Sequence, residues 1–320
     1  MMSILLALAV SAQTAAAAAQ EQPVQLETAT GTLHGTLLLP AKVDGKVPVA
    51  LIIAGSGPTD RNGNSPALPG QNNSLKLLAE ALANEGIASV RYDKRAIGAS
   101  AAAATSEADL RFSHYVDDAA AWVRQLRADR RFSTITVIGH SEGSLIGMLA
   151  TVSADADAFV SIAGAGRSLG DIIREQLDRN LPSAMKPDAF RILDELRAGR
   201  TVAEVPQPLI ALYRPSVQPY LISQLNISPA AEIAKVKVPV LIVQGTTDIQ
   251  IPTGEAEVLK AANPAAQVAL LDGMNHILKE VREQAKQVAS YSDPTLPLHP
   301  QLGPAVTAHI LQRAELRASK

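Results

Sequence analysis

The sequence predicts an α/β fold in which a mostly parallel central sheet is flanked by helices and carries an inserted helical cap. Runs of aliphatic and β-branched residues, typical of buried strands, alternate with amphipathic stretches typical of helices. A Gly-x-Ser-x-Gly pattern at 139–143 separates one such run from the start of a helix. The 320 residues, of which 47% are hydrophobic, suffice for one large domain with an insertion or for two small domains.

The expected elements follow this alternation. A hairpin with its turn at Gly31 should come first, and parallel strands with crossover helices should follow. Strands are expected at 24–30, 32–39, 47–53, 87–92, 135–138, 158–163, 238–245 and 267–271. Helices are expected at 75–84, capped by Asn73 or Ser74 and ended by Gly86, and at 115–127, 144–150, 169–181 and 188–198.

The segment 167–237 is predicted to be a helical cap inserted into a core formed by 20–166 and 238–320. It is longer than the crossover connections of such a sheet require, which is roughly 30 residues for each βαβ unit. Helical stretches fill its first half, and Pro-punctuated sequence runs from 206 to 229. The alternative is extra helix packed on the flank of the sheet. A cap would shape the substrate pocket and exclude water from it.

Residues 1–19 are predicted to be a signal peptide. A short apolar run at 3–10 is followed by small residues, and an Ala-x-Ala cleavage site precedes Gln20. The run is too short to span a membrane. It is atypical because no Lys or Arg precedes it, and the alternative is an Ala-rich leader. The pattern favours export, to a periplasm or by secretion, without stable membrane insertion.

Composition narrows the function classes. The net charge of −2 gives no indication of nucleic-acid or anionic-membrane binding. Only 3% of residues are aromatic, which argues against a carbohydrate platform or a base-stacking surface. The chain has no cysteine, which excludes disulfides, a thiol nucleophile and cysteine metal ligands.

Ser141 is the candidate nucleophile. The Gly-x-Ser-x-Gly pattern between a buried strand and a helix is typical of a nucleophile elbow, a turn so tight that the serine backbone is strained and its hydroxyl stands clear of the sheet. Gly139 and Gly143 would keep side chains off this corner. The alternative is an ordinary Gly-rich turn.

Asp248 and His276 are the candidate acid and base. Each follows an expected strand, so both should reach the sheet edge at which Ser141 lies, in the chain order serine, acid, histidine. Asp248 could instead cap a turn, and His276 could be a hydrogen-bonded loop histidine. Asp272 is a weaker candidate acid because it is too close to His276 along the chain. Among the rival histidines, His140 adjoins the nucleophile, but neighbouring side chains at a sharp turn should point apart.

These residues resemble the α/β-hydrolase superfamily, and more narrowly bacterial serine esterases of the dienelactone-hydrolase-related type. The similarity covers most of the chain after about Val24 and rests on segments 54–63, 91–100, 139–143 and 245–248. Ala96 stands where the family commonly has glycine, which predicts a minor backbone change. The tail at 291–298 also looks like the end of such esterases.

The resemblance implies an oxyanion hole made by the backbone N–H groups of Ser56 and Glu142. The strand at 47–53 leads into an Ala-Gly-Ser-Gly-Pro loop, in which Pro58 has no N–H to donate. A plain Gly-Pro turn is the alternative. A phosphate loop is disfavoured because the Gly-Lys-Ser/Thr ending is missing.

The expected reaction is cleavage of a small-molecule carboxylic ester through an acyl-enzyme, with Ser141, Asp248 and His276 as the triad and without metal or organic cofactor. The same triad would serve a serine peptidase or a thioesterase. A non-catalytic binding protein that reuses the fold is the alternative from another class. The oligomeric state, acyl length and stereopreference are left open.

Overall fold

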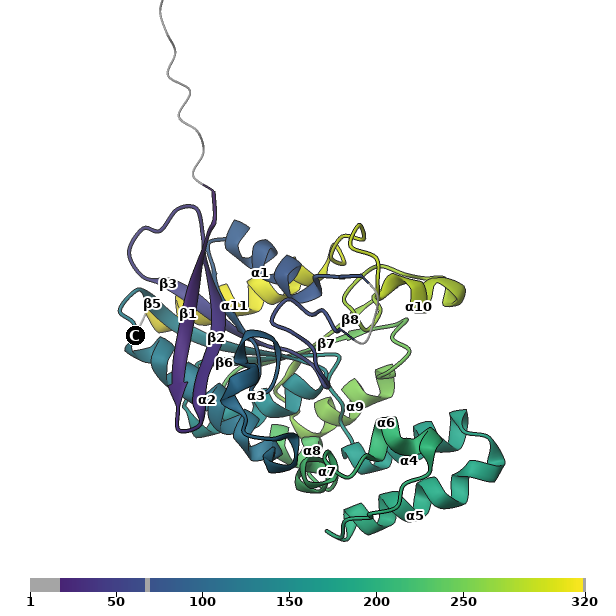
Figure 1. The fold of residues 1–320 in the computed structure, drawn as a ribbon. Helices are drawn as coiled ribbons and strands as arrows, with labels where there is room; N and C mark the ends of the chain where they lie inside the picture. The colour runs from purple at the N-terminus through teal and green to yellow at the C-terminus, as the bar shows by residue number, and fades with distance from the viewer. Residues whose placement is uncertain (1–17, 67–69, 319–320) are drawn as a thin grey trace, which may run out of the picture.

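The computed structural model describes residues 18–66 and 70–318, and its centre is a single eight-stranded sheet (Figure 1). The strand order is β1-β2-β4-β3-β5-β6-β7-β8. The antiparallel hairpin β1–β2 pairs antiparallel with β4, and every further pair from β4 to β8 is parallel. The mostly parallel α/β sheet predicted from the sequence is therefore confirmed. Of the predicted signal peptide, residues 1–17 lie outside the described residues.

The strands lie close to the predicted ranges, and in the middle of the sheet this agreement follows from the continuously apolar sequence of buried parallel strands. They are β1 (Gln20–Thr28), β2 (Gly31–Leu39), β3 (Val47–Ile53), β4 (Ala88–Tyr92), β5 (Phe132–His140), β6 (Ala158–Ile162), β7 (Val240–Gly245) and β8 (Gln267–Leu271). The hairpin turn differs by two residues from the prediction. It falls at 29–30, and Gly31, with φ 145°, already begins β2.

Two helical layers cover the sheet. One face packs on α1 (Ser74–Asn84) and α11 (Leu302–Ala318), whose buried leucines and isoleucines join those of the strands. The other face packs on α2 (Phe112–Ala128), α3 (Glu142–Ser153), α8 (Pro229–Ile233) and α9 (Thr253–Ala262). Each helix buries one apolar face against the sheet, as an α/β layer fold requires. A short helix, α10 (Gln287–Ser290), lies in the segment between β8 and α11.

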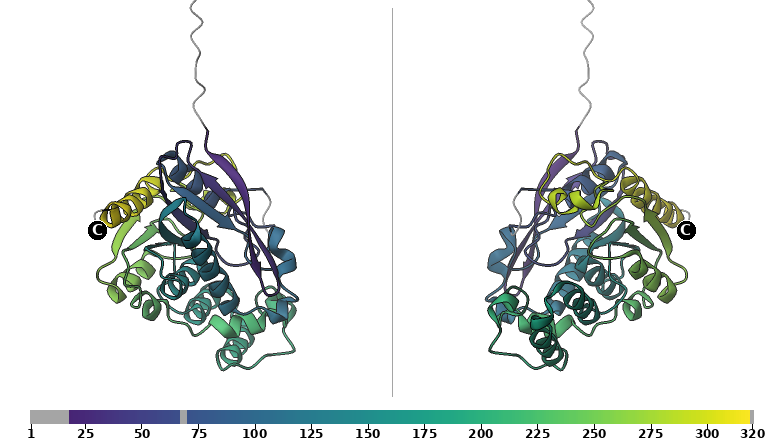
Figure 2. Two further views of the ribbon diagram at one scale, coloured as in Figure 1. Left: turned by 90° about the vertical axis from the view of Figure 1, so that its left-hand side faces the viewer. Right: turned by 90° about the vertical axis from the view of Figure 1, so that its right-hand side faces the viewer.

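The segment after β6 forms a separate helical layer with an apolar core of its own. It contains α4 (Leu169–Asn180), α5 (Lys186–Arg197), α6 (Ile210–Tyr213) and α7 (Gln218–Gln224). Figures 1 and 2 show these helices projecting from one end of the domain. The last part of the segment behaves differently, because Ile233 of α8 and Val236 pack in the main core. No helix within 18–66 and 70–318 is long and apolar enough to cross a membrane.

Candidate active site

Ser141 lies in a strained turn between β5 and α3. Its backbone has φ 55° and ψ −122°, a conformation that residues other than glycine rarely adopt. A Cβ atom at Gly139 would lie 2.1 Å from the Gly143 carbonyl oxygen, and one at Gly143 would lie 2.4 Å from the Ile53 oxygen. The corner therefore has room only for glycine on either side of the serine.

Asp248 and His276 come together at the carboxyl ends of β7 and β8. The Nδ1 atom of His276 lies 2.8 Å from Oδ2 of Asp248, and both side chains are almost completely buried. The other oxygen, Oδ1, accepts the backbone N–H groups of Gln250 and Ile251 at 2.8 and 2.9 Å. Burial by itself would raise the pKa of Asp248, but the imidazole and these two donors lower it below its usual value. The carboxylate therefore stays ionised and holds the proton of the imidazole on Nδ1.

His140, which the sequence analysis set aside, contacts the same histidine. Its Nε2–H donates to the backbone carbonyl of His276 at 2.8 Å, and the two rings lie 4.9 Å apart between centroids. Burial, and to a smaller extent the neighbouring His276, lowers the pKa of His140 to about 3, so that His140 is neutral. A neutral donor therefore fixes the backbone that carries the candidate base.

The structure links Ser141 to the candidate base through its chain neighbour His140. Within the described residues, no hydrogen bond joins the Ser141 hydroxyl to the His276 imidazole. His140 precedes Ser141 in the chain and packs on His276, which connects the elbow to the histidine loop.

The rival candidates lie elsewhere. Asp272 is exposed and pairs with Arg282 and Thr246. The remaining histidines make other contacts. His34 bonds to the Gln25 amide, and His114 accepts the backbone N–H of Arg111 at the start of α2. His299 donates to the backbone carbonyl of Asp272, and His309 lies in α11. Of the acids and histidines weighed from the sequence, the structure pairs only Asp248 with His276.

The loop after β3 closes over the elbow. A Cβ atom at Gly55 would lie 3.2 Å from Cβ of Ser141, so the backbone of the loop approaches the candidate nucleophile closely. Ser56 and Gly57 are exposed toward the cavity that Ser141 and Glu142 also line. The two residues predicted to donate oxyanion N–H groups, Ser56 and Glu142, therefore share one cavity wall with the serine.

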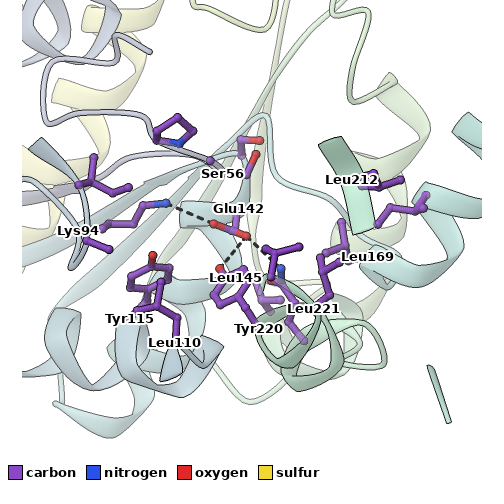
Figure 3. A pocket seen from close by; sticks show the side chains of 18 of the residues that line it. Ser56, Lys94, Leu110, Tyr115, Glu142, Leu145, Leu169, Leu212, Tyr220 and Leu221 are labelled. Carbon is purple, nitrogen blue, oxygen red and sulfur yellow. Dashed lines mark hydrogen bonds and ion pairs between the residues drawn. The ribbon is translucent and has the colours of Figure 1, made fainter. Parts of the chain in front are cut away.

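Glu142 brings a polar cluster that the sequence analysis missed (Figure 3). Its Oε1 accepts the Tyr220 hydroxyl at 2.9 Å and the Gln224 amide at 3.2 Å, and its Oε2 lies 3.3 Å from Nζ of Lys94. Tyr220 and Gln224 belong to α7, whereas Lys94 follows β4. The partners are far apart in the chain, and the pattern around the elbow gave no signal for them.

A cavity of about 820 Å³ extends from the elbow to the helical layer that follows β6. Its walls are mainly aliphatic and come from the core and from α4, α6 and α7, with Leu145, Ile172, Leu212 and Leu221 among them. The two arginines at its border are paired: Arg214 with Glu107, and Arg167 with Glu175 and Glu255. The cavity therefore presents apolar walls and no unpaired cation among the described residues that line it.

Two of the sequence motifs meet behind the site. Asp93 accepts the backbone N–H of Arg61 at 2.8 Å and its guanidinium at 2.7 Å, and it also accepts the N–H of Ala99 at 2.9 Å. This carboxylate fixes the loops after β3 and β4 against each other. Ala96, where the family commonly has glycine, adopts φ 71°. This left-handed backbone explains why glycine would suit that position.

Metal ligation has no candidate cluster in the described part of the chain, where no group of three or more His, Cys, Asp or Glu side chains could hold an ion.

Comparison with known proteins gives a family match and a similar protein. Residues 71–179 match the serine aminopeptidase S33 family. The esterase EstD of Thermotoga maritima is 26% identical over 253 residues, which are 77% of this chain and 58% of that protein. The chain thus spans less than two thirds of the length of this relative.

Solved structures share the fold. Est1E from Butyrivibrio proteoclasticus superposes with a TM-score of 0.59 at 17% identity, over 93% of this chain and 99% of that one. Dienelactone hydrolase from Anabaena variabilis superposes with a TM-score of 0.53 at 14% identity, over 92% and 98% of the two chains. At these identities the likeness concerns the fold.

Proposed function

We propose that the chain is a serine hydrolase of the α/β-hydrolase superfamily that cleaves carboxylic esters through an acyl-enzyme intermediate. The observation that carries the proposal is the buried Asp248–His276 pair, together with a strained elbow at Ser141 whose preceding residue, His140, packs on His276. A binding protein has no need to hold this pair or to strain this turn. The esterase name of the Thermotoga maritima relative supports the same activity.

The proposed reaction begins with proton transfer. Substrate in the cavity displaces water and brings the Ser141 hydroxyl to Nε2 of His276, which takes the proton as Oγ attacks the ester carbonyl. Asp248 stabilises the imidazolium, because its ionised carboxylate accepts the Nδ1–H at 2.8 Å. The imidazolium then protonates the leaving alcohol, and a water activated by the same imidazole hydrolyses the acyl-enzyme.

The N–H groups of Ser56 and Glu142 are proposed to hold the oxyanion. Each donor of this kind lowers the barrier by about 3–4 kcal/mol. The aliphatic cavity walls and the paired arginines favour a neutral ester with an apolar group of moderate size over a carboxylate-bearing substrate.

The serine aminopeptidase match makes peptide hydrolysis the second candidate, and a thioester substrate would use the same triad. A survey of p-nitrophenyl esters, aminoacyl p-nitroanilides and acyl thioesters separates these activities. We expect kcat/KM to be highest for the esters. A higher value for the anilides would favour the peptidase.

The role of Ser141 is tested by Ser141→Ala. We expect p-nitrophenyl acetate hydrolysis to fall at least ~10³-fold while the urea unfolding midpoint is retained, because removing a nucleophile leaves only residual catalysis. Near-normal turnover by the variant would overturn the assignment.

We propose the same division of the chain into core and cap that the sequence predicts. Residues 20–166 and 238–320 form the catalytic core, and 167–237 form the cap. Residues 1–19 are proposed to be an export signal that is cleaved off. N-terminal sequencing of the mature protein tests this, and we expect its first residue to be Gln20.

A further inference from the structure

Lys94 is a buried cation that the proposed reaction does not use. Its side chain is 1% exposed, and its ammonium lies over the ring of Tyr115 at 5.0 Å from the centroid. Nζ donates to the carbonyl oxygen of Gly55 at 2.5 Å and lies 3.3 Å from Oε2 of Glu142. One ammonium therefore contacts both segments that are proposed to form the oxyanion hole.

The contact with Gly55 has a geometric consequence. The carbonyl of Gly55 and the N–H of Ser56 belong to the same peptide unit, and the described residues contain no cis peptide bond. In a planar trans peptide the C=O and N–H bonds point in opposite directions. An ammonium that holds the Gly55 oxygen on one side thus directs the Ser56 N–H to the other.

The loop needs such an anchor. Ser56 and Gly57 are exposed, Gly57 adopts φ 66°, and the glycines on both sides of Ser56 leave the peptide free to rotate. A cationic donor is a strong hydrogen-bonding partner for a carbonyl, and it polarises the peptide so that its N–H becomes a better donor.

The second contact extends the anchor to the elbow and the cap. Glu142 supplies the other proposed oxyanion N–H, and its carboxylate links Lys94 to Tyr220 and Gln224 of α7. Figure 3 shows the side chains of Lys94 and Tyr220 pointing toward Glu142 in the cavity. Both oxyanion donors and the cap are thereby fixed relative to one ammonium.

We propose that Lys94 is a positioning residue that orients the oxyanion hole, acting through the Gly55–Ser56 peptide and through Glu142. The proposal rests on the proposed ester hydrolysis. It assigns Lys94 no contact with substrate, so its loss should weaken transition-state binding and leave ground-state binding nearly unchanged.

The test is Lys94→Met, which keeps the length of the side chain and removes its charge. We expect kcat to fall by about 10- to 100-fold, which does not exceed the fall in kcat caused by removing one oxyanion donor. KM should change less than about threefold. The inhibition constant of an aryl trifluoromethyl ketone, which forms a tetrahedral oxyanion on the serine, should rise by the same factor as kcat/KM falls.

Two further variants separate positioning from stability. Lys94→Met leaves Glu142 uncompensated, so the double variant Lys94→Met/Glu142→Gln provides a neutral version if the single variant does not fold, and it should show the same kcat loss. Arg95→Met is the matched control, because Arg95 is the neighbouring buried cation and pairs instead with Asp118. It should lower the urea midpoint and leave kcat within about threefold.

The outcomes are distinct. Unchanged kcat and inhibitor affinity in the folded Lys94 variants would overturn the positioning role while Ser141→Ala is inactive. A rise confined to KM, or an equal kcat loss in Arg95→Met, would also overturn it. Retained hydrolysis in Ser141→Ala would instead refute the proposed function itself.

Discussion

Replacing Asp248 by asparagine perturbs the candidate site at one atom. Oδ1 of Asp248 accepts the backbone N–H groups of Gln250 and Ile251, so the amide oxygen of an asparagine must take that place. The amide nitrogen then faces Nδ1 of His276, where the carboxylate oxygen lay at 2.8 Å. Because an NH₂ group donates, Nδ1 must accept, and the imidazole carries its proton on Nε2.

This wrong tautomer has no lone pair to receive the serine proton. A change of this type lowers kcat by about 10⁴-fold, or roughly 5.5 kcal/mol of transition-state stabilisation. The alternative amide orientation would set the NH₂ group against two backbone N–H donors, which costs about 1–3 kcal/mol for each donor left unsatisfied. The structure therefore offers the asparagine no orientation that preserves the active tautomer at low cost.

The assay is steady-state hydrolysis of p-nitrophenyl acetate, with the urea midpoint followed by the fluorescence of Trp122, the single tryptophan. Asp272→Asn is the matched control because Asp272 is the exposed acid after β8 and pairs with Arg282. It should keep wild-type kcat. A loss smaller than about tenfold in Asp248→Asn, or an equal loss in Asp272→Asn, would refute the reasoning.

Two further predictions concern stability. The pKa of His140 falls from 6.5 to about 3 in the folded protein, so the unfolded chain binds one more proton between these values. Stability should therefore be lost as pH falls through this window, by about 1.4 kcal/mol per pH unit from this group. His140→Gln should show a correspondingly shallower pH dependence of the urea midpoint, and an unchanged slope would contradict the assignment. Ala96→Gly should stabilise the protein by about 0.5–1 kcal/mol, because relief of the φ 71° strain exceeds the added chain entropy; a lower midpoint would contradict this.

The sheet was predictable because its signal is local. Buried parallel strands are apolar on both faces, and the range expected for β3 agrees with the structure residue for residue. The range expected for β8 agrees as well, although β8 is an edge strand that leaves Val268 and Leu270 exposed. The predicted hairpin turn was misplaced because Gly31 was taken as the turn, whereas the turn lies just before it at 29–30. In the structure the hydroxyl of Thr28 donates to the carbonyl of Gly31 at 2.6 Å, which closes the turn at 29–30.

The contacts around the candidate site were less predictable because they join distant parts of the chain. His140 was set aside on the argument that neighbours in a sharp turn diverge, yet the histidine loop returns to its ring from 136 residues away. Lys94 and Glu142 are 48 residues apart and meet only because β4 and β5 flank β3. The end of the cap, predicted at residue 237, was also hard to predict. The packing of α8 in the main core depends on tertiary contacts that the local sequence does not show.

The covalent intermediate provides the most direct test of the central claim, that Ser141 attacks the substrate. Rapid mixing with a p-nitrophenyl ester, acid quenching within the first turnover and peptide mapping by mass spectrometry would locate the acyl group. The account predicts an acyl adduct on the peptide that contains Ser141, formed together with the first equivalent of p-nitrophenol. An adduct on another residue, or repeated turnover with no adduct on any peptide, would contradict it.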